Sequence, residues 1–485
     1  MKLYLRGHGE LYAVEQLQMQ LFPAEPSELV EAPFGDEDGT VSTLHRTERN
    51  LIAATKITYK GKTAAATRRI PLAQEDIKSR RRILQQSYYR AAVQLLEQVP
   101  PWGALAGVRP TKISTAFLLE GGSLRDCDRM LEKTYFVTPE RRRLCLDASE
   151  HTLAAVDKLR ERDLSLYIGV PFCPTRCVYC SFVSESVEKL GNLVEPYLQA
   201  LLREVRATGP MLKRSGYHIR TLYVGGGTPT TFSAEQLTRL LTAVRESFDL
   251  SRCLELTVEG GRPDTLDEEK LQALADLGVS RISINPQTMN DAVLEKIGRK
   301  HSTAQTLEAY RLAKAVGFAS VNMDLIAGLP GDTPETYADS LRRVIALAPE
   351  NITVHTLALK KGADLFWNRE QLPTGAQVAQ MLDDSNALLR AAGYSPYYLY
   401  RQKYMSGSFE NVGWSKPGTD GLYNIYMMEE RHSILALGSG GMNKINLAQN
   451  NLERFHNPKY PQEYIERIDD IIEKKEHIFG LLSRL

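Results

Sequence analysis

The sequence predicts an α/β fold in which six strand–helix units form a partial (β/α)6 TIM-like barrel. This prediction rests on short β-rich runs that alternate with stretches of helical period, because parallel neighbours need a crossover of a dozen or more residues. The predicted strands are Leu164–Val170, Ile219–Val224, Leu254–Val258, Arg281–Asn285, Ser320–Ile326 and Asn351–Leu357. The predicted helices span about residues 192–207, 234–247, 267–277, 290–297, 304–316 and 334–347.

Composition places the chain among folded, non-membrane proteins. Its 485 residues are 43% hydrophobic, with 60 Lys and Arg against 59 Asp and Glu, a formal charge of +1. Six cysteines are too few for a disulfide scaffold, and no apolar run approaches the 18 residues of a membrane span. Met1–Arg6 lacks the apolar core of a signal peptide. We therefore expect a cytoplasmic protein with no global attraction to nucleic acid.

The pattern along the chain predicts three parts. They are an N-terminal accessory α+β domain at residues 1–155, the core at 156–375 and a small C-terminal family-specific region at 376–485. In the first part we expect strands near Lys2–Arg6 and Val41–Arg49, then a helix at about Asp76–Gln98. A charged helix is expected at the end of the chain.

Three cysteines follow the first predicted strand of the core. Cys173, Cys177 and Cys180 have the spacing C-x3-C-x2-C. Loops after parallel strands carry the chemistry of such folds, and closely spaced thiolates hold iron–sulfur clusters. Three ligands on four irons leave one iron open to a substrate. A structural zinc site is the alternative, but it usually adds a second Cys/His pair, and none follows before His218.

The other cysteines are isolated, and we expect them to be small buried hydrophobic residues. They are Cys127, Cys145 and Cys253.

Polar or glycine-rich segments lie near or just after the C-terminal ends of the other predicted strands. They are Gly225–Pro229, Glu259, Asn285–Gln287, Asp324 and Thr356–Ala358. Each has an ordinary alternative, because three glycines can form a plain turn and a loop carboxylate can face water. Their recurrence at equivalent strand ends favours a ligand site.

The cysteine loop, with Tyr179 just before Cys180, resembles that of the radical S-adenosylmethionine (radical SAM) superfamily. Further strings narrow the resemblance, over about residues 164–445, to the oxygen-independent coproporphyrinogen III dehydrogenase (oxidase) family, which includes heme-chaperone relatives. These strings are Val224–Pro229, Arg281–Gln287, Ile297–Arg299, Asp324–Gly331 and Lys416–Gly418. The resemblance implies a [4Fe-4S] cluster that binds S-adenosylmethionine at its open iron and generates a 5′-deoxyadenosyl radical.

The resemblance also assigns roles to residues of this chain. It implies that the cluster ligands are Cys173, Cys177 and Cys180. Contacts to the cluster-bound S-adenosylmethionine would come from Tyr167, Tyr179, Gly226, Glu259 and Ala358. Contacts to a second S-adenosylmethionine would come from Gly227, Thr228, Gln287, Arg299 and Asp324. The small-residue run that ends at Met442 would close over the cofactor.

Four positions depart from the family pattern. Phe182 stands where the dehydrogenase commonly has a fourth cysteine, Gly169 stands in place of a histidine, and Asn285–Pro286 replaces Gly-Val. These differences bear on the substrate more than on the radical chemistry.

Residues 61–90 carry eight Lys and Arg against two acidic residues, a local excess of +6. Arg68–Arg69, Arg80–Arg82 or Arg109 could bind the propionates of a tetrapyrrole, since guanidinium groups bind carboxylates in a bidentate manner. The alternative is that they are solvated helix charges. Nucleic acid is disfavoured, because aromatic residues are missing from 61–82.

The resemblance implies conversion of coproporphyrinogen III to protoporphyrinogen IX in heme biosynthesis, with an electron donor such as flavodoxin or ferredoxin. Two other hypotheses stay open at this stage. One is a heme-binding chaperone that retains the cluster, and the other is a radical SAM enzyme that acts on another anionic substrate, heme or RNA.

Overall fold

The chain divides into two compact units in the computed structural model. The first, the N-terminal unit, comprises Met1–Asp147 with Arg401–Phe409, and the second, the core unit, comprises Ala148–Tyr400 with Glu410–Leu485. The predicted division at residues 155 and 375 stays a prediction. The structure describes residues 1–23, 25–35, 37–97, 99–181, 184–360, 362–367, 371–401, 409–447 and 451–483.

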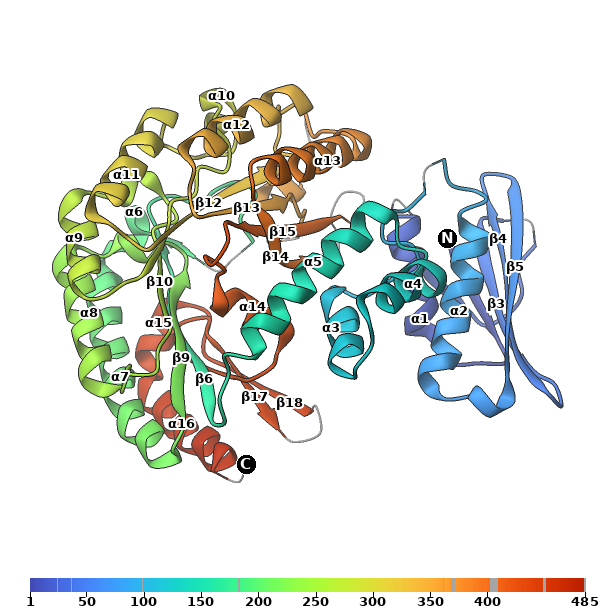
Figure 1. Ribbon diagram of the computed structural model, residues 1–485, viewed down its shortest axis with the longest axis horizontal. Coiled ribbons are helices and arrows are strands. Elements are labelled where there is room, and N and C mark those ends of the chain that lie inside the picture. The colour runs from blue at the N-terminus through green and yellow to red at the C-terminus, as the bar shows by residue number, and fades with distance from the viewer. Residues whose placement is uncertain are drawn as a thin grey trace. The chain divides into compact units, whose positions relative to one another are not determined.

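The N-terminal unit contains a sheet with the strand order β2-β1-β3-β4-β5. Its strands are β1 (Lys2–Arg6), β2 (Glu28–Val30), β3 (Gly39–Arg46), β4 (Asn50–Tyr59) and β5 (Lys62–Pro71). Its helices are α1 (Leu11–Leu21), α2 (Ile77–Ala92), α3 (Thr111–Leu119) and α4 (Leu124–Tyr135), and α5 (Pro139–Val156) follows them. Helices α1 and α2 cover one face of the sheet, where alternate β4 residues such as Leu51 and Ala53 are buried (Figure 1).

The two strands and the helix predicted for this unit are confirmed. The structure also contains the β4–β5 hairpin, which was not predicted from the sequence. Arg68 and Arg69 lie on β5, so the interpretation as solvated helix charges is wrong for them. Arg80 and Arg81 lie on α2 and form ion pairs at 3.0 Å with Glu75 and 2.7 Å with Glu10, respectively.

The core unit is built on the six predicted strands, which are parallel to one another. They are β6 (Asp163–Val170), β9 (His218–Gly226), β10 (Glu255–Glu259), β11 (Arg281–Ser283), β12 (Ser320–Ala327) and β13 (Asn351–Thr356). The predicted partial barrel is therefore confirmed.

C-terminal strands extend this sheet at both edges instead of closing it. Among the described residues the order is β14-β15-β13-β12-β11-β10-β9-β6-β16-β17-β18. The added strands are β14 (Ser395–Arg401), β15 (Glu410–Ser415), β16 (Ser433–Gly438), β17 (Met442–Leu447) and β18 (Asn451–His456). Strand β16 is parallel to β6, whereas β15 is antiparallel to β13.

The helices that follow the strands form an arc outside the curved sheet (Figure 1). They are α7 (Val194–Ser215), α8 (Ala234–Ser247), α9 (Glu268–Asp276), α10 (Asp291–Lys296), α11 (Thr303–Val316), α12 (Pro334–Leu347) and α13 (Gly375–Ala391). Helix α7 continues beyond its predicted end and through Pro210, because Met211 and Leu212 extend its buried face. Capping boxes begin α8, α11, α12 and α13, and each N-cap contributes about 1 kcal/mol.

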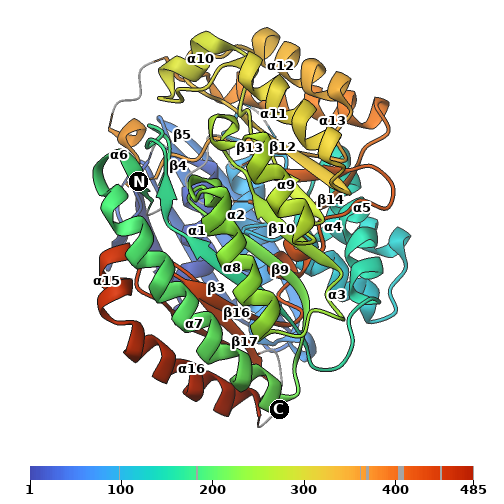
Figure 2. The same cartoon turned by 90° about the vertical axis from the view of Figure 1, so that its left-hand side faces the viewer.

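The tail forms α15 (Pro461–Glu466) and α16 (Ile468–Leu482), and α16 runs alongside α7 (Figure 2). Near the cysteines lie β7 (Phe172–Cys173), β8 (Glu185–Ser186) and α6 (Val187–Leu190). In the described part of the chain, no helix is both long enough and apolar enough to cross a membrane.

Helix α14 (Leu422–Glu429) lies inside the curve of the sheet (Figure 1). The buried Glu255 carboxylate, at the start of β10, accepts hydrogen bonds from the amides of Leu422 at 2.7 Å and Tyr423 at 3.1 Å. A carboxylate is favourable at a helix N-terminus because the first amides lack partners within the helix. Arg281, at the start of β11, donates to Asn351 Oδ1 at 2.8 Å. These contacts close the N-terminal end of the sheet.

Candidate active site

The three predicted ligand cysteines lie in one short segment after β6. Cys173 ends β7, and the Cys180 amide donates to the Cys177 carbonyl at 3.0 Å. The Val178 amide donates to Ile297 O at 3.1 Å, which fixes the segment against the loop after α10. Burial raises the pKa of the Cys173 thiol, although Thr228 Oγ1 donates to its sulfur at 3.4 Å. Within the described chain the six cysteines are free of disulfides.

The glycine-rich segment packs directly on the cysteine segment. The amides of Gly227 and Thr228 donate to Val170 O at 2.8 Å and Phe172 O at 2.7 Å. A Cβ at Gly227 would lie 2.5 Å from Phe172 O and 3.0 Å from Cys173 Sγ. Only glycine permits this close approach, so the glycine at position 227 is required by packing and not only by a turn.

Glu259 lies at the end of β10, beside the glycine segment. It accepts a hydrogen bond from the Tyr223 hydroxyl, and its Oε2 accepts one from the Gly226 amide at 3.2 Å. Burial raises the pKa of Glu259 to about 7, and the nearby charge of Asp324 adds to this effect. This carboxyl group can therefore change its charge near neutral pH.

Three tyrosines stack on one another near Glu259, which accepts a hydrogen bond from one of them, Tyr223. Their ring centroids lie 6.3 Å apart for Tyr167 and Tyr223, 4.4 Å for Tyr223 and Tyr423, and 6.4 Å for Tyr167 and Tyr423. Tyr167 was predicted as a site residue, but Tyr223 and Tyr423 were not. An aromatic residue just before the glycines could have indicated Tyr223, whereas Tyr423 comes from α14 and left no local signal.

Gln287 bridges the ends of β11 and β12. Its amide donates to Asp324 O at 2.9 Å, and its carbonyl accepts from the Ile326 amide at 2.9 Å. Its φ of +68° lies in the left-handed region, where a residue other than glycine carries strain of about 1 kcal/mol. Among the described residues, buried Gln287 Oε1 and Asn285 Oδ1 have no hydrogen-bond partner.

The Asp324 carboxylate faces the same region. Its Oδ1 accepts from Asn322 Nδ2 at 2.7 Å, and its Oδ2 lies 3.6 Å from His355 Nε2. Burial alone would raise the pKa of Asp324, but His355 and Asn322 outweigh burial and lower it. His355, on β13, was not predicted as a site residue, because a single histidine within a strand carries no distinguishing pattern.

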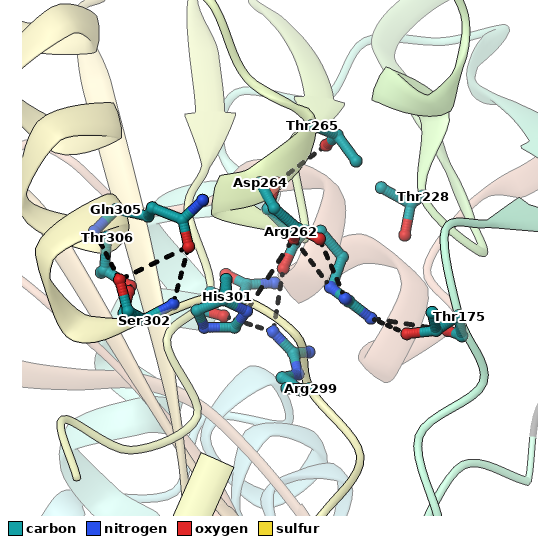
Figure 3. A network of polar contacts seen from close by, with 12 residues as sticks. Thr175, Thr228, Arg262, Asp264, Thr265, Arg299, His301, Ser302, Gln305 and Thr306 are labelled. Carbon is teal, nitrogen blue, oxygen red and sulfur yellow. Dashed lines mark hydrogen bonds and ion pairs between the residues drawn. The ribbon is translucent and has the colours of Figure 1, made fainter. Parts of the chain in front are cut away.

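Two buried guanidinium groups flank the cysteine segment. Arg299 Nη1 donates to Asn285 O at 2.7 Å, and the side chains of Tyr179 and Cys177 raise the pKa of Arg299 against the opposing effect of burial. Arg262, which was not predicted, donates to both carboxylate oxygens of Asp264 and to Thr175 Oγ1 (Figure 3).

The two remaining predicted contacts lie at opposite edges of the parallel strands. Ala358 follows β13 and is half-buried, and half-buried Met442 begins β17, which pairs with β16. The roles assigned to all these site residues stay predictions. Of the isolated cysteines, Cys127 and Cys145 are buried as expected, whereas Cys253 is half-buried and donates to Glu255 O at 3.3 Å.

One departure from the family pattern has a structural reason. A Cβ at Gly169 would lie 2.5 Å from Ser439 O, so the approach of β16 to β6 excludes a larger residue there. Phe182, another departure, lies outside the described residues.

The donor set and its surroundings fit an iron–sulfur cluster with an organic ligand. Among the described residues no three Cys, His, Asp or Glu side chains could hold a single metal ion. The ligands of a four-iron cluster each bind a different iron, so their sulfurs need not converge on one point. Three thiols in one segment, a backbone surface that only glycine permits and the unpartnered oxygens of Asn285 and Gln287 suit such a group.

Comparisons with known proteins agree with this geometry. The sequence model of the radical SAM superfamily matches residues 167–344. The chain is 40% identical over 380 residues to the oxygen-independent coproporphyrinogen-III oxidase-like protein HemZ of Bacillus subtilis, covering 77% of this chain and 76% of HemZ. It is 31% identical to the heme chaperone HemW of Haemophilus influenzae, covering 62% of this chain and 76% of HemW.

A solved structure of the coproporphyrinogen III oxidase HemN from Escherichia coli superposes with a TM-score of 0.54 and 26% identity, covering 66% of this chain and 72% of HemN. The fold and the matched region thus define a radical SAM protein. Within that superfamily the chain belongs to the oxygen-independent coproporphyrinogen III oxidase family, which also has heme-chaperone relatives. Membership implies a [4Fe-4S] cluster and S-adenosylmethionine.

Proposed function

We propose that the protein is a cytoplasmic radical SAM oxidoreductase that converts coproporphyrinogen III to protoporphyrinogen IX. The observation that carries the proposal is the packing of the cysteine segment on the glycine segment, beside Glu259, at the C-terminal ends of the strands. The 40% identity with the coproporphyrinogen-III oxidase-like protein HemZ supports the substrate class.

Cys173, Cys177 and Cys180 would hold the cluster, and the Gly226 region with Glu259 would receive the bound S-adenosylmethionine. When bound, these groups supply a 5′-deoxyadenosyl radical. Tyr167, Tyr179 and Ala358 complete the first cofactor site, and a second S-adenosylmethionine would contact Gly227, Thr228, Gln287, Arg299 and Asp324.

The reaction balances at each of two propionates. A hydrogen atom would pass from the β-carbon to the 5′-deoxyadenosyl radical, the bond to the carboxylate would break with release of CO2, one electron would pass to an acceptor, and a vinyl group would remain. The chain's own part is to hold the propionate near the cofactor and to exclude water from the radical. Flavodoxin or ferredoxin would supply the electron that starts each cycle.

Anaerobic reconstitution with iron and sulfide, followed by S-adenosylmethionine, dithionite and coproporphyrinogen III, tests the proposal. We expect 5′-deoxyadenosine together with a product that carries vinyl groups, measured by chromatography and mass spectrometry. Formation of 5′-deoxyadenosine without vinyl product would reject coproporphyrinogen III and retain the radical chemistry.

A heme chaperone is the second candidate, because HemW proteins match the chain at 31% and 33% identity. Optical titration with heme separates the two. Stoichiometric heme binding without turnover of coproporphyrinogen III would favour the chaperone.

A further inference from the structure

Arg262 contacts the candidate cluster segment. Its side chain is buried, with 2% of the residue exposed, and it follows Glu259 by three positions. Its Nε and Nη2 donate to the two carboxylate oxygens of Asp264 at 3.0 Å and 3.1 Å. Its Nη1 donates to Thr175 Oγ1 at 3.1 Å, so that Arg262 lies between Asp264 and Thr175 (Figure 3). Because this bidentate geometry fixes the guanidinium plane, the third nitrogen has a defined direction.

That third nitrogen faces a predicted cluster ligand. Arg262 Nη1 lies 3.9 Å from Cys177 Sγ, within the range of a hydrogen bond to sulfur. It also donates to the Thr175 carbonyl at 3.4 Å, two residues before Cys177. Arg262 therefore holds the backbone of the segment and contacts its central sulfur.

The charges around Cys177 do not cancel. Arg299 is a second buried guanidinium beside Cys177, while Asp264 is the carboxylate that pairs with Arg262. Burial and the two arginines lower the pKa of His301 to about 3, which keeps this imidazole neutral at pH 7. Arg262 and Arg299 thus place two positive charges beside Cys177, and the carboxylate of Asp264 pairs with one of them.

We propose that Arg262 is a positioning residue that orients Cys177 and raises the reduction potential of the cluster. The inference rests on the proposed function, because it requires Cys173, Cys177 and Cys180 to hold that cluster. Hydrogen bonds to ligand sulfurs and nearby positive charge favour the more negative, reduced state. A higher potential makes electron transfer from any given donor more favourable.

Substitutions that change the local charge in opposite directions test the inference. R262Q removes the positive charge, R262K keeps the charge without the bidentate fork, and D264N removes the compensating negative charge. R245Q is the matched control, because Arg245 is an exposed arginine of α8 that donates only to the Leu277 carbonyl among the contacts described for it. The midpoint potential of the reconstituted full chain is measured by redox titration monitored by electron paramagnetic resonance (EPR), together with iron and sulfide content.

We expect R262Q to lower the potential by about 59 mV or more, which is tenfold in the equilibrium constant of a one-electron couple. D264N should raise the potential, R262K should shift it less than R262Q, and R245Q should leave it unchanged. A loaded R262Q cluster with the wild-type potential would overturn the inference. If R262Q loads no cluster, the D264N variant provides the test. A reduction potential of D264N that does not rise above that of the wild type overturns the inference.

The outcomes separate this inference from the proposed function. A loaded wild-type cluster whose potential ignores Arg262 and Asp264 rejects only the role of Arg262. A potential that responds as expected, in a protein that forms no vinyl product, supports the inference and rejects the proposed reaction. A wild-type chain that loads no cluster overturns both.

Discussion

Buried polar residues at the two ends of the parallel core strands differ in their hydrogen-bond partners. At the N-terminal ends, Glu255 and Arg281 are satisfied by the chain itself, through the amides of α14 and the side chain of Asn351. At the C-terminal ends, buried oxygens of Asn285 and Gln287 have no partner among the described residues. Glu255 and Arg281 are thus completed by protein, whereas Asn285 and Gln287 have the unsatisfied oxygens, and Gln287 the backbone strain, that binding sites concentrate. The difference predicts that mutations at the first end reduce stability and that mutations at the second reduce binding.

Loss of a cysteine should give the largest effect at the C-terminal end. C173A, C177A and C180A should each abolish cluster loading and lower activity by at least a thousandfold, because a bound iron loses its protein ligand. Iron content, sulfide content and visible absorbance measure the loss. C253A is the control, since Cys253 is outside this segment. Full iron content in C177A would contradict the ligand assignment.

Loss of Glu255 should give the largest effect at the N-terminal end. E255Q should reduce the free energy of unfolding by about 2 kcal/mol, because an amide replaces a buried carboxylate that accepts hydrogen bonds from two α14 amides. Urea denaturation measures this change, and cluster loading should stay at the wild-type level. A variant of normal stability that fails to load the cluster would reverse the contrast between the two ends.

Glu259 should make the stability of the cluster-free chain depend on pH. Its raised folded-state pKa of about 7 favours the protonated, folded form at low pH, and this contribution is lost as the pH rises from about 4.5 through 7. E259Q should therefore gain stability relative to wild type, by about 3 kcal/mol at pH 8 and less at pH 5. Urea denaturation at both values gives the difference. An equal gap at the two pH values would contradict the raised pKa.

E259Q should also weaken S-adenosylmethionine binding in the reconstituted protein by about tenfold. Equilibrium dialysis with labelled cofactor measures the dissociation constant. Unchanged affinity would remove Glu259 from the cofactor site.

Substitution of Gln287 should give the smallest change in stability, and it should raise stability while it weakens binding. Q287G should raise the free energy of unfolding by about 1 kcal/mol, because glycine adopts a φ of +68° without strain. The same variant should weaken cofactor or substrate binding, since the Gln287 side-chain oxygen is removed. A destabilised Q287G would show that the side chain is structural.

The strands and the cysteine site could be predicted because their signals are local. The C-x3-C-x2-C spacing lies within eight residues, and the first five predicted strands of the core precede helices with a recognisable period, whereas α13, after the sixth strand, was not predicted. Glu259 was found because it ends a strand, and Asp324 because it lies in the C-terminal half of one, near the strand ends where ligand residues gather.

The rest depends on contacts between residues far apart in sequence. Glu255 meets Leu422, which is 167 residues away, and Tyr423 stacks on Tyr223 only because α14 enters the curve of the sheet. In the sequence, Arg262 looks like an ordinary loop arginine. Its contact with Cys177, which lies 85 residues earlier, is visible only in the folded structure. Strand β16 is a further parallel neighbour of β6. The sequence pattern could not predict this pairing, because no hydrophobic periodicity indicates it.

The most direct test of the contrast between the two ends is the EPR spectrum of the reconstituted, dithionite-reduced protein before and after S-adenosylmethionine is added. We expect the signal of a reduced [4Fe-4S] cluster that changes when the cofactor binds its open iron, is retained in E255Q and is absent in C177A. A chain that shows no such signal, or a signal that S-adenosylmethionine leaves unchanged, would contradict the assignment of the C-terminal end as the cofactor site.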